Sequence, residues 1–151
     1  MEIRVLDFEL LTRHYVKYQE GVKKIEEEKN IFLEKIKPIQ KEMNLIISSF
    51  TGGLVIDNES QEQKRERFSI LEEQLVNEER ELSLKLKDMS LSINKECYSD
   101  LADIVKKWSI SHNIDLVLSK NEVTYVKSVY DSTDDILYLL KQMNIFVDYS
   151  E

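Results

Sequence analysis

The side chains that most often carry out chemistry in proteins are few in this sequence and far apart. The two histidines, His14 and His112, stand about a hundred positions apart, and neither has a partner at metal-ligand spacing. The single cysteine, Cys97, falls among apolar residues at helical spacing, which favours a buried small side chain over a reactive thiol. Gly52-Gly53 lacks the lysine and the spacing of a phosphate-binding loop. We therefore expect no enzyme activity, no metal site and no cofactor, and surface or capping roles for both histidines.

Apolar side chains in the segment 50–60 offer a different kind of binding. Phe50 is followed there by the run Leu54-Val55-Ile56. Two interpretations are open: a small cluster that folds back onto the neighbouring helices, or an exposed apolar surface that touches unfolded proteins. The carboxylates, by contrast, are scattered along helical faces, where solvated pairs are normal.

The segment that precedes this tip has the apolar spacing of a coiled-coil helix. Steps of three and four residues continue from Val22 to Phe50 without a break, with one lysine in the series, and the residues between are mostly charged. Such a narrow stripe is the seam of a coiled coil. The series is Val22, Ile25, Lys29, Phe32, Ile36, Ile39, Met43, Ile46 and Phe50. Pro38 lies inside the pattern and predicts a kink near 34–38, and Gly21 marks its entrance.

A second stripe follows the tip and runs to Trp108, with Glu78 at the one skipped position. Gly52-Gly53 is expected to end the first helix, and Ser60 or Asn58 to cap a second one over 61–111. Two helices with matching seams and a short connection predict an antiparallel hairpin, an arm over 21–108. The stripe is Phe68, Leu71, Leu75, Leu82, Leu86, Met89, Ile93, Cys97, Leu101, Ile104 and Trp108.

The two ends of the chain predict a small body over 1–20 and 109–151. Residues 2–8 have the composition of a strand, residues 9–20 turn into helix, and 114–118 and 123–126 are expected to form a β-hairpin. Thr133 or Ser132 is expected to cap a last helix. The fold class is thus α+β and mainly α. Three strands make a poor sheet alone and leave open edges, which favours an oligomer that shares a body.

The composition of the chain limits the kinds of partner and compartment that can be expected. The net charge of −8 over 151 residues argues against nucleic acid as a ligand, and the basic run 64–67 is expected to be a solvated helical turn. No apolar run is long enough for a membrane span. Met1 leads directly into the first strand without a signal peptide, so we expect either a cytosolic protein or a mature form with an added methionine.

Three segments carry a resemblance to a known family. They are the opening strand at 3–7, the segment 114–118 with the one that contains Tyr125, and 131–137, which has a helix start of the form D-x-T-x-x-[IV]-[LI]. Through these segments the chain resembles the Skp (OmpH-like) family of periplasmic chaperones. The order of elements agrees over nearly the whole chain, although the arms match by pattern only.

The resemblance implies a homotrimer in the periplasm, in which strands form a β-barrel body and three arms enclose a cavity. It implies an ATP-independent holdase for unfolded outer-membrane proteins. The best-known members are basic and this chain is acidic, so we expect at most weak contact with membrane surfaces. The body would include Ile3, Val5, Leu116, Leu118, Val123 and Tyr125. Candidate client contacts are Met43, Ile47, Phe50, Leu54, Val55, Ile56 and Met89.

Two alternatives remain open from the sequence. A cytosolic prefoldin-like chaperone also carries coiled-coil arms on a β body, but its strands lie between the two helices rather than outside them. A coiled-coil regulator could insert its hairpin tip into a partner such as RNA polymerase, with Asp57 and Glu59 as an acidic pair. The apolar run beside that pair argues against the second alternative.

Overall fold

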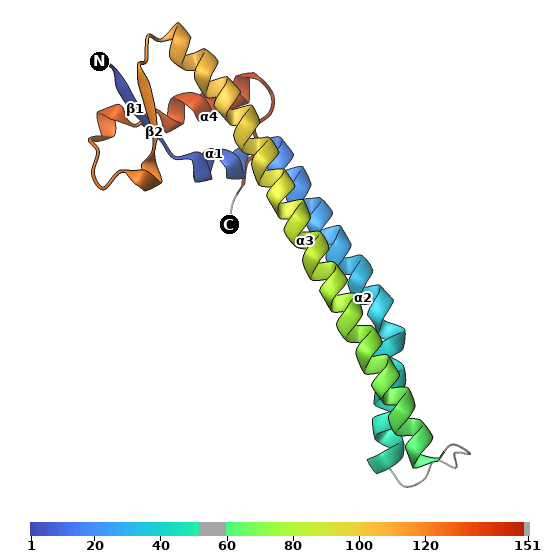
Figure 1. Ribbon diagram of the computed structural model, residues 1–151. Coiled ribbons are helices and arrows are strands. Elements are labelled where there is room, and N and C mark those ends of the chain that lie inside the picture. Colours follow the sequence, from blue (N-terminus) through green and yellow to red (C-terminus); the bar gives the residue numbers. More distant parts are fainter. Residues whose placement is uncertain (52–59, 150–151) are drawn as a thin grey trace. The chain divides into compact units, whose positions relative to one another are not determined.

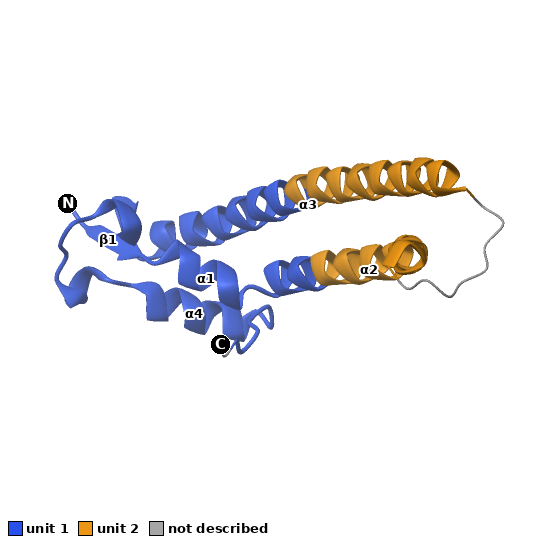
Figure 2. Ribbon diagram, turned by 90° about the horizontal axis from the view of Figure 1, so that it is seen from below, with its two compact units in different colours: residues 1–23, 89–151 blue, residues 24–88 orange. Residues whose placement is uncertain are grey.

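The computed structural model describes residues 1–51 and 60–149. Their element order confirms a mainly helical α+β fold with a helical hairpin (Figure 1). The described residues form two compact units, residues 1–23 with 89–151, called unit 1, and residues 24–88, called unit 2 (Figure 2). The elements are β1 (Ile3–Leu6), α1 (Phe8–His14), α2 (Val16–Thr51), α3 (Gln61–Ser111), β2 (Leu116–Ser119), two short 3-10 helices (Lys120–Glu122 and Ser128–Tyr130) and α4 (Thr133–Gln142).

Unit 2 consists of antiparallel segments of α2 and α3 that meet along the predicted seams. Ile39, Ile46 and Leu71 are its buried core, and Met43, Phe68 and Leu75 pack against them. All predicted seam positions of α3 from residue 68 to 108 are buried or half-buried, Glu78 included. The seam of α3 is therefore confirmed along its whole length.

The seam of α2 departs from the prediction in its first part. Val22 is 42% exposed and Lys29 is also exposed, whereas Gly21 is buried and Glu28 is half-buried. An α-helix has 3.6 residues per turn, so a stripe that repeats every seven residues drifts around the helix unless the chain supercoils. The inward positions shift by one residue toward the start of α2, and the predicted seam positions Val22 and Lys29 were wrong. Phe50, the last predicted seam position, was also wrong, because its side chain is 40% exposed.

Gly21 is packed directly against α3 within unit 1. A Cβ atom built on Gly21 would lie 2.6 Å from Cδ1 and 2.7 Å from Cγ1 of Ile93. A branched side chain in a helix has little rotamer freedom with which to yield. Position 21 thus requires glycine because two helices approach each other closely there.

We expect Gly21→Ala to destabilise the protein, although alanine in a helix normally gains about 1 kcal/mol over glycine. Overpacking costs about 1–3 kcal/mol, so the net change should be a loss of about 1 kcal/mol in the free energy of unfolding, measured by urea titration. In an Ile93→Ala background the obstructing carbons are gone, and the same substitution should stabilise. A gain in both backgrounds would contradict this account.

The ends of the long helices follow local signals. The Ser60 backbone N–H donates to Gln63 Oε1 at 3.1 Å, and the Gln63 backbone N–H donates to Ser60 Oγ at 3.2 Å. This reciprocal capping box confirms Ser60 as the cap and 61–111 as the helix. α2 continues through Pro38, as the apolar pattern predicted. Gly52-Gly53 and Asn58 lie outside the described residues.

Unit 1 contains the larger core. Leu6, Leu11, Leu101, Ile136 and Leu140 are fully buried there, and Trp108 packs against their cluster. Cys97 is 1% exposed, and burial raises the pKa of its thiol. A raised pKa keeps the thiol protonated, which confirms its role as a small buried side chain.

The sheet pairs the two ends of the chain rather than neighbouring segments. β1 and β2 run parallel, with Ile3 opposite Leu116 and Val5 opposite Leu118. The predicted hairpin is wrong in its second half, because 120–122 form a 3-10 helix and 123–126 form no strand. β2 finds its partner in β1, and Val5 also forms a bridge with Asp131.

The helix expected over 9–20 is interrupted at Tyr15. Its backbone is extended, with φ −78° and ψ 129°, and it forms a bridge with Phe146. The Val16 N–H donates to the Ile145 carbonyl at 3.0 Å, and the His14 carbonyl accepts from the Val147 N–H at 2.7 Å. The chain's C-terminal segment thus supplies the hydrogen bonds that end α1 at His14.

Candidate functional site

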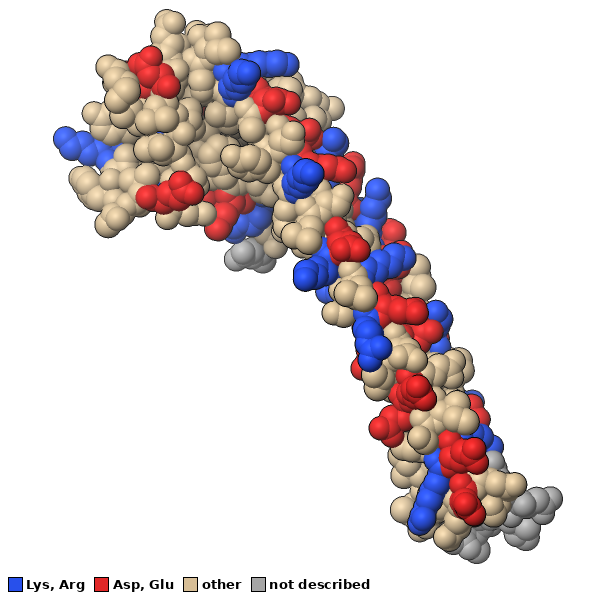
Figure 3. All heavy atoms as spheres, in the orientation of Figure 1, with Lys and Arg blue, Asp and Glu red and all other residues tan. Residues whose placement is uncertain are grey.

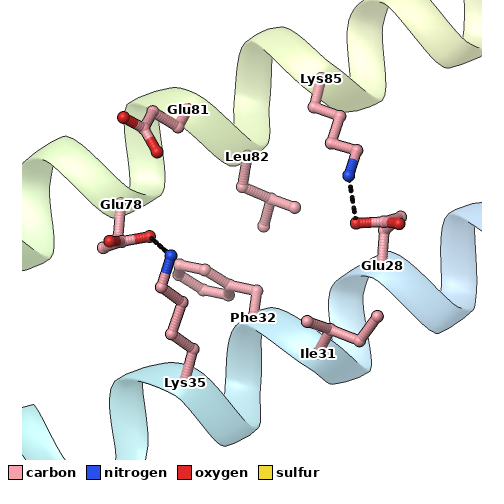
Figure 4. Close-up of a pocket in the computed structure, with 8 residues that line it drawn as sticks. All are labelled: Glu28, Ile31, Phe32, Lys35, Glu78, Glu81, Leu82 and Lys85. Carbon is pink, nitrogen blue, oxygen red and sulfur yellow. Dashed lines mark ion pairs between the residues drawn. The ribbon is translucent and has the colours of Figure 1, made fainter.

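One flank of unit 2 is closed by ion pairs between the helices, and we call it the bridged flank. Lys35 Nζ lies 2.9 Å from Glu78 Oε2, and Lys85 Nζ lies 2.8 Å from Glu28 Oε2 (Figure 4). Arg67 Nε lies 3.6 Å from Glu42 Oε1. The hydrogen bond to Glu78 raises the pKa of Lys35, which keeps the lysine charged. The Glu78 side chain is only 19% exposed, so this pair replaces an apolar layer of the seam.

A shallow pocket of about 200 Å³ lies within the bridged flank. Phe32 and Leu82 point toward each other between the two ion pairs (Figure 4). Lys35 and Lys85 neutralise Glu78 and Glu28, and Glu81 is the one further carboxylate in the lining. A single carboxylate supplies fewer ligands than a metal site needs. We conclude that this pocket is a polar interruption of the contact between α2 and α3.

Among the described residues, the other flank of unit 2 has no ion pair between the helices, and we call it the open flank. Leu33 and Ile47 each come directly after a seam residue of α2, whereas Lys35 comes directly before one. Because each residue turns the helix by 100°, Leu33 and Ile47 lie on the opposite side of the seam from Lys35. Leu33 is 52% exposed and Ile47 is 49% exposed. Sequence reasoning missed Leu33, although its spacing of fourteen residues, two heptads, from Ile47 was a usable signal.

α3 contributes Glu72, Val76 and Glu79 to the open flank. Each of them follows a seam residue of α3, whereas Arg67 and Glu81, on the bridged flank, each precede one. In an antiparallel helix pair, residues that precede a seam residue on one helix face residues that precede a seam residue on the other, as Arg67 and Glu42 do. Residues that follow a seam residue face one another in the same way. Val76 is 46% exposed, and within the described residues Glu72 and Glu79 form no ion pair.

The predicted client contacts fall into three groups. Ile47 and Phe50 are exposed, at 49% and 40%, and the Lys64 ammonium lies 5.8 Å from the centre of the Phe50 ring. Met43 packs against the core of unit 2, and Met89 is half-buried on α3. Leu54, Val55 and Ile56 lie outside the described residues.

The predicted body residues lie in and after the sheet. Ile3, Val5, Leu116 and Leu118 belong to β1 and β2, and Val5 is 2% exposed. Leu116 is 41% exposed, Tyr125 is 78% exposed and Val123 is half-buried. Sequence reasoning missed two further exposed apolar residues nearby, Val129 and Tyr130.

The distribution of charge differs between the helices and the sheet. On the visible face, acidic and basic side chains alternate along the helices, while the part of unit 1 that carries the strands shows a larger uncharged area (Figure 3). An uncharged, partly apolar surface beside a small sheet is typical of a contact with another protein.

The groups that could do chemistry have structural roles. A ring nitrogen of His14 lies 2.8 Å from the Val147 carbonyl, and the ring stacks on Phe146. His112 Nδ1 lies 2.9 Å from the Trp108 carbonyl at the end of α3, which agrees with the expected capping role. Among the described residues, no three His, Cys, Asp or Glu side chains gather as a metal would need. No helix in the described part of the chain is long and apolar enough to cross a membrane.

A family model described as outer membrane protein (OmpH-like) matches residues 2–140. No curated protein matches the chain.

Proposed function

We propose that this chain, which belongs to the OmpH-like family, is an ATP-independent holdase that binds unfolded outer-membrane proteins and prevents their aggregation. The family, that of the Skp chaperones, is one of periplasmic chaperones of outer-membrane proteins. The match over residues 2–140 carries the proposal, because it spans both the arm and the sheet.

The surface of unit 2 supports a holdase. Exposed apolar side chains are spread along its helices rather than gathered in one deep pocket, and six charged side chains of the bridged flank are joined in three ion pairs. A client would therefore be held by many weak contacts, and several arms acting together would supply retention without a single tight site. Ile47 and Phe50, with Leu54, Val55 and Ile56 of the tip, remain our candidates for these contacts.

We further propose a homotrimer in the periplasm, with a shared body formed by 1–20 and 109–151 and with arms formed by 21–108. An isolated two-stranded sheet is marginal in water, and its open edges favour pairing with other chains. The exposed Leu116, Tyr125, Val129 and Tyr130 beside the sheet would be covered in such an assembly. The strands flank the helical hairpin in the chain, which argues against the prefoldin-like alternative.

Two measurements test the proposal. Light scattering on a sizing column should give about 54 kDa for three copies of the 17.9 kDa chain. Dilution of a urea-unfolded outer-membrane β-barrel protein should aggregate less in the presence of the chain, equally with and without ATP. Leu54→Ser/Val55→Ser/Ile56→Ser should weaken this suppression while the mass stays unchanged. Undiminished client aggregation with the wild-type chain would refute the holdase proposal.

A further inference from the structure

The two flanks of unit 2 differ in what they leave available to a partner. On the bridged flank, Glu28, Lys35, Glu42, Arg67, Glu78 and Lys85 are paired across the helices. A ligand that used these charges would first have to break an existing pair. On the open flank, Lys37 of α2 is paired within its own helix, with Nζ 2.6 Å from Glu34 Oε1. The exposed apolar side chains and the glutamates of α3 have no ion-pair partner on the other helix within the described residues.

We infer that the open flank, formed by Leu33, Ile47, Glu72, Val76 and Glu79, is the client-contact face of the arm. We also infer that its occupant is an extended segment of unfolded chain in which apolar and basic side chains alternate. This inference rests on the proposed holdase function and specifies the surface and the client chemistry.

The spacing of the apolar groups suits an extended segment. Leu33 and Ile47 are separated by fourteen residues of α2, or about 21 Å at 1.5 Å per residue. An extended chain advances about 3.3 Å per residue, so a client segment of roughly seven residues would contact both Leu33 and Ile47. Successive side chains of an extended chain point to opposite sides, which lets alternate residues face the arm.

The charges of the open flank favour a client segment that carries basic residues. Glu72, Glu73, Glu79 and Arg80 lie one helical turn from Val76, so three carboxylates and one guanidinium surround an exposed apolar group. Exposed carboxylates attract lysine and arginine weakly, and salt screens that attraction within about 10 Å at 0.1 M. A segment with basic residues between its apolar ones would satisfy both kinds of group, whereas an acidic segment would be repelled.

The test compares matched serine variants on the two flanks. The open-flank variant is Leu33→Ser/Ile47→Ser/Val76→Ser, and the control is Ile31→Ser/Leu45→Ser/Ile70→Ser. All six residues are between 46% and 62% exposed, and the control residues each precede a seam residue and so lie toward the bridged flank. We expect the open-flank variant to bind a urea-unfolded β-barrel protein at least tenfold more weakly and the control less than twofold. Equal losses in both variants, or a larger loss in the control, would overturn the inference.

Two synthetic nine-residue peptides test the charge, one alternating valine with lysine and one alternating valine with glutamate. The lysine peptide should bind more tightly, and Glu72→Gln/Glu79→Gln should weaken it several-fold at low salt without weakening the glutamate peptide. No change for the lysine peptide would exclude the assigned role of the two glutamates.

A photo-crosslinking residue gives an answer that does not depend on destabilising substitutions. p-Benzoylphenylalanine at position 33 should cross-link to the unfolded client, and the same residue at position 31 should not. Cross-links from position 33 to another copy of the chain would identify an interface between copies instead and contradict the inference. If the wild-type chain fails to suppress aggregation, the holdase proposal itself fails. If it suppresses aggregation and the open-flank variant does so equally, only the choice of flank is wrong.

Discussion

Leu101→Ala is expected to lower the free energy of unfolding by about 2–5 kcal/mol, the range for a fully buried leucine truncated to alanine. Leu101 is 0% exposed and belongs to the cluster that joins α1, α3 and α4 in unit 1. Removing its side chain takes away buried apolar surface and leaves a cavity that the surrounding helices can only partly fill.

The measurement is a urea titration of both proteins at one protein concentration, since assembly makes stability concentration-dependent. Leu91→Ala is the matched control, because Leu91 is the same residue type on the same helix and is 60% exposed. Its effect should stay within about 0.5 kcal/mol. Equal shifts for the two variants would mean that unit 1 does not form the core described above.

Thr133→Val is expected to lower the free energy of unfolding by about 1–3 kcal/mol, because it removes a buried hydroxyl that accepts one hydrogen bond and donates another. Thr133 is 5% exposed. Its Oγ accepts from the Asp7 backbone N–H at 3.0 Å and donates to Asp131 Oδ1. Asp7 in turn caps α1 by accepting from the Leu10 N–H at 3.1 Å. Valine has nearly the same shape, so the loss would report the hydrogen bonds rather than a cavity.

The effect of Thr133→Val should depend on pH. Burial acts to raise the pKa of Asp131, but hydrogen bonds from Thr133 and Lys120 outweigh burial, and the pKa lies below its ordinary value. A lowered pKa stabilises the fold above the unfolded value of about 3.9 and loses that contribution as the pH falls through the folded pKa. The difference between wild type and Thr133→Val should therefore be larger at pH 7 than at pH 2.5.

Two substitutions act as controls for Thr133→Val. Thr133→Ser keeps the hydroxyl and should recover most of the stability. Thr124→Val, at an exposed threonine, should have little effect. A loss with Thr133→Ser as large as with valine would show that the methyl group, and not the hydrogen bonds, is what matters.

The open flank shows how far sequence reasoning reached toward the candidate site. The heptad spacing identified the seams, and Ile47 was singled out as a client contact. Leu33 and Val76 were not, because the difference between the flanks depends on which lysines of one helix meet which glutamates of the other. Lys35 and Glu78 are 43 positions apart in the sequence, and their 2.9 Å contact requires the register of the folded hairpin.

The sequence by itself determined the features that depend on neighbouring residues. The spacing of apolar side chains predicted the seam of α3, the Ser60 signal predicted its start, and the apolar surroundings of Cys97 predicted its burial. Helical periodicity and capping act over three or four residues, so they can be recognised without knowing the fold.

Only the tertiary structure decided the features that join distant segments. The parallel pairing of β1 with β2 replaced the expected local hairpin. Hydrogen bonds with the segment 145–147 end α1 at His14, and the close approach of Ile93 leaves room only for glycine at position 21. In each case a backbone group or a small space is satisfied by a partner about seventy or more positions away, and that contact outweighs the local preference. Such partners exist only once the chain has folded.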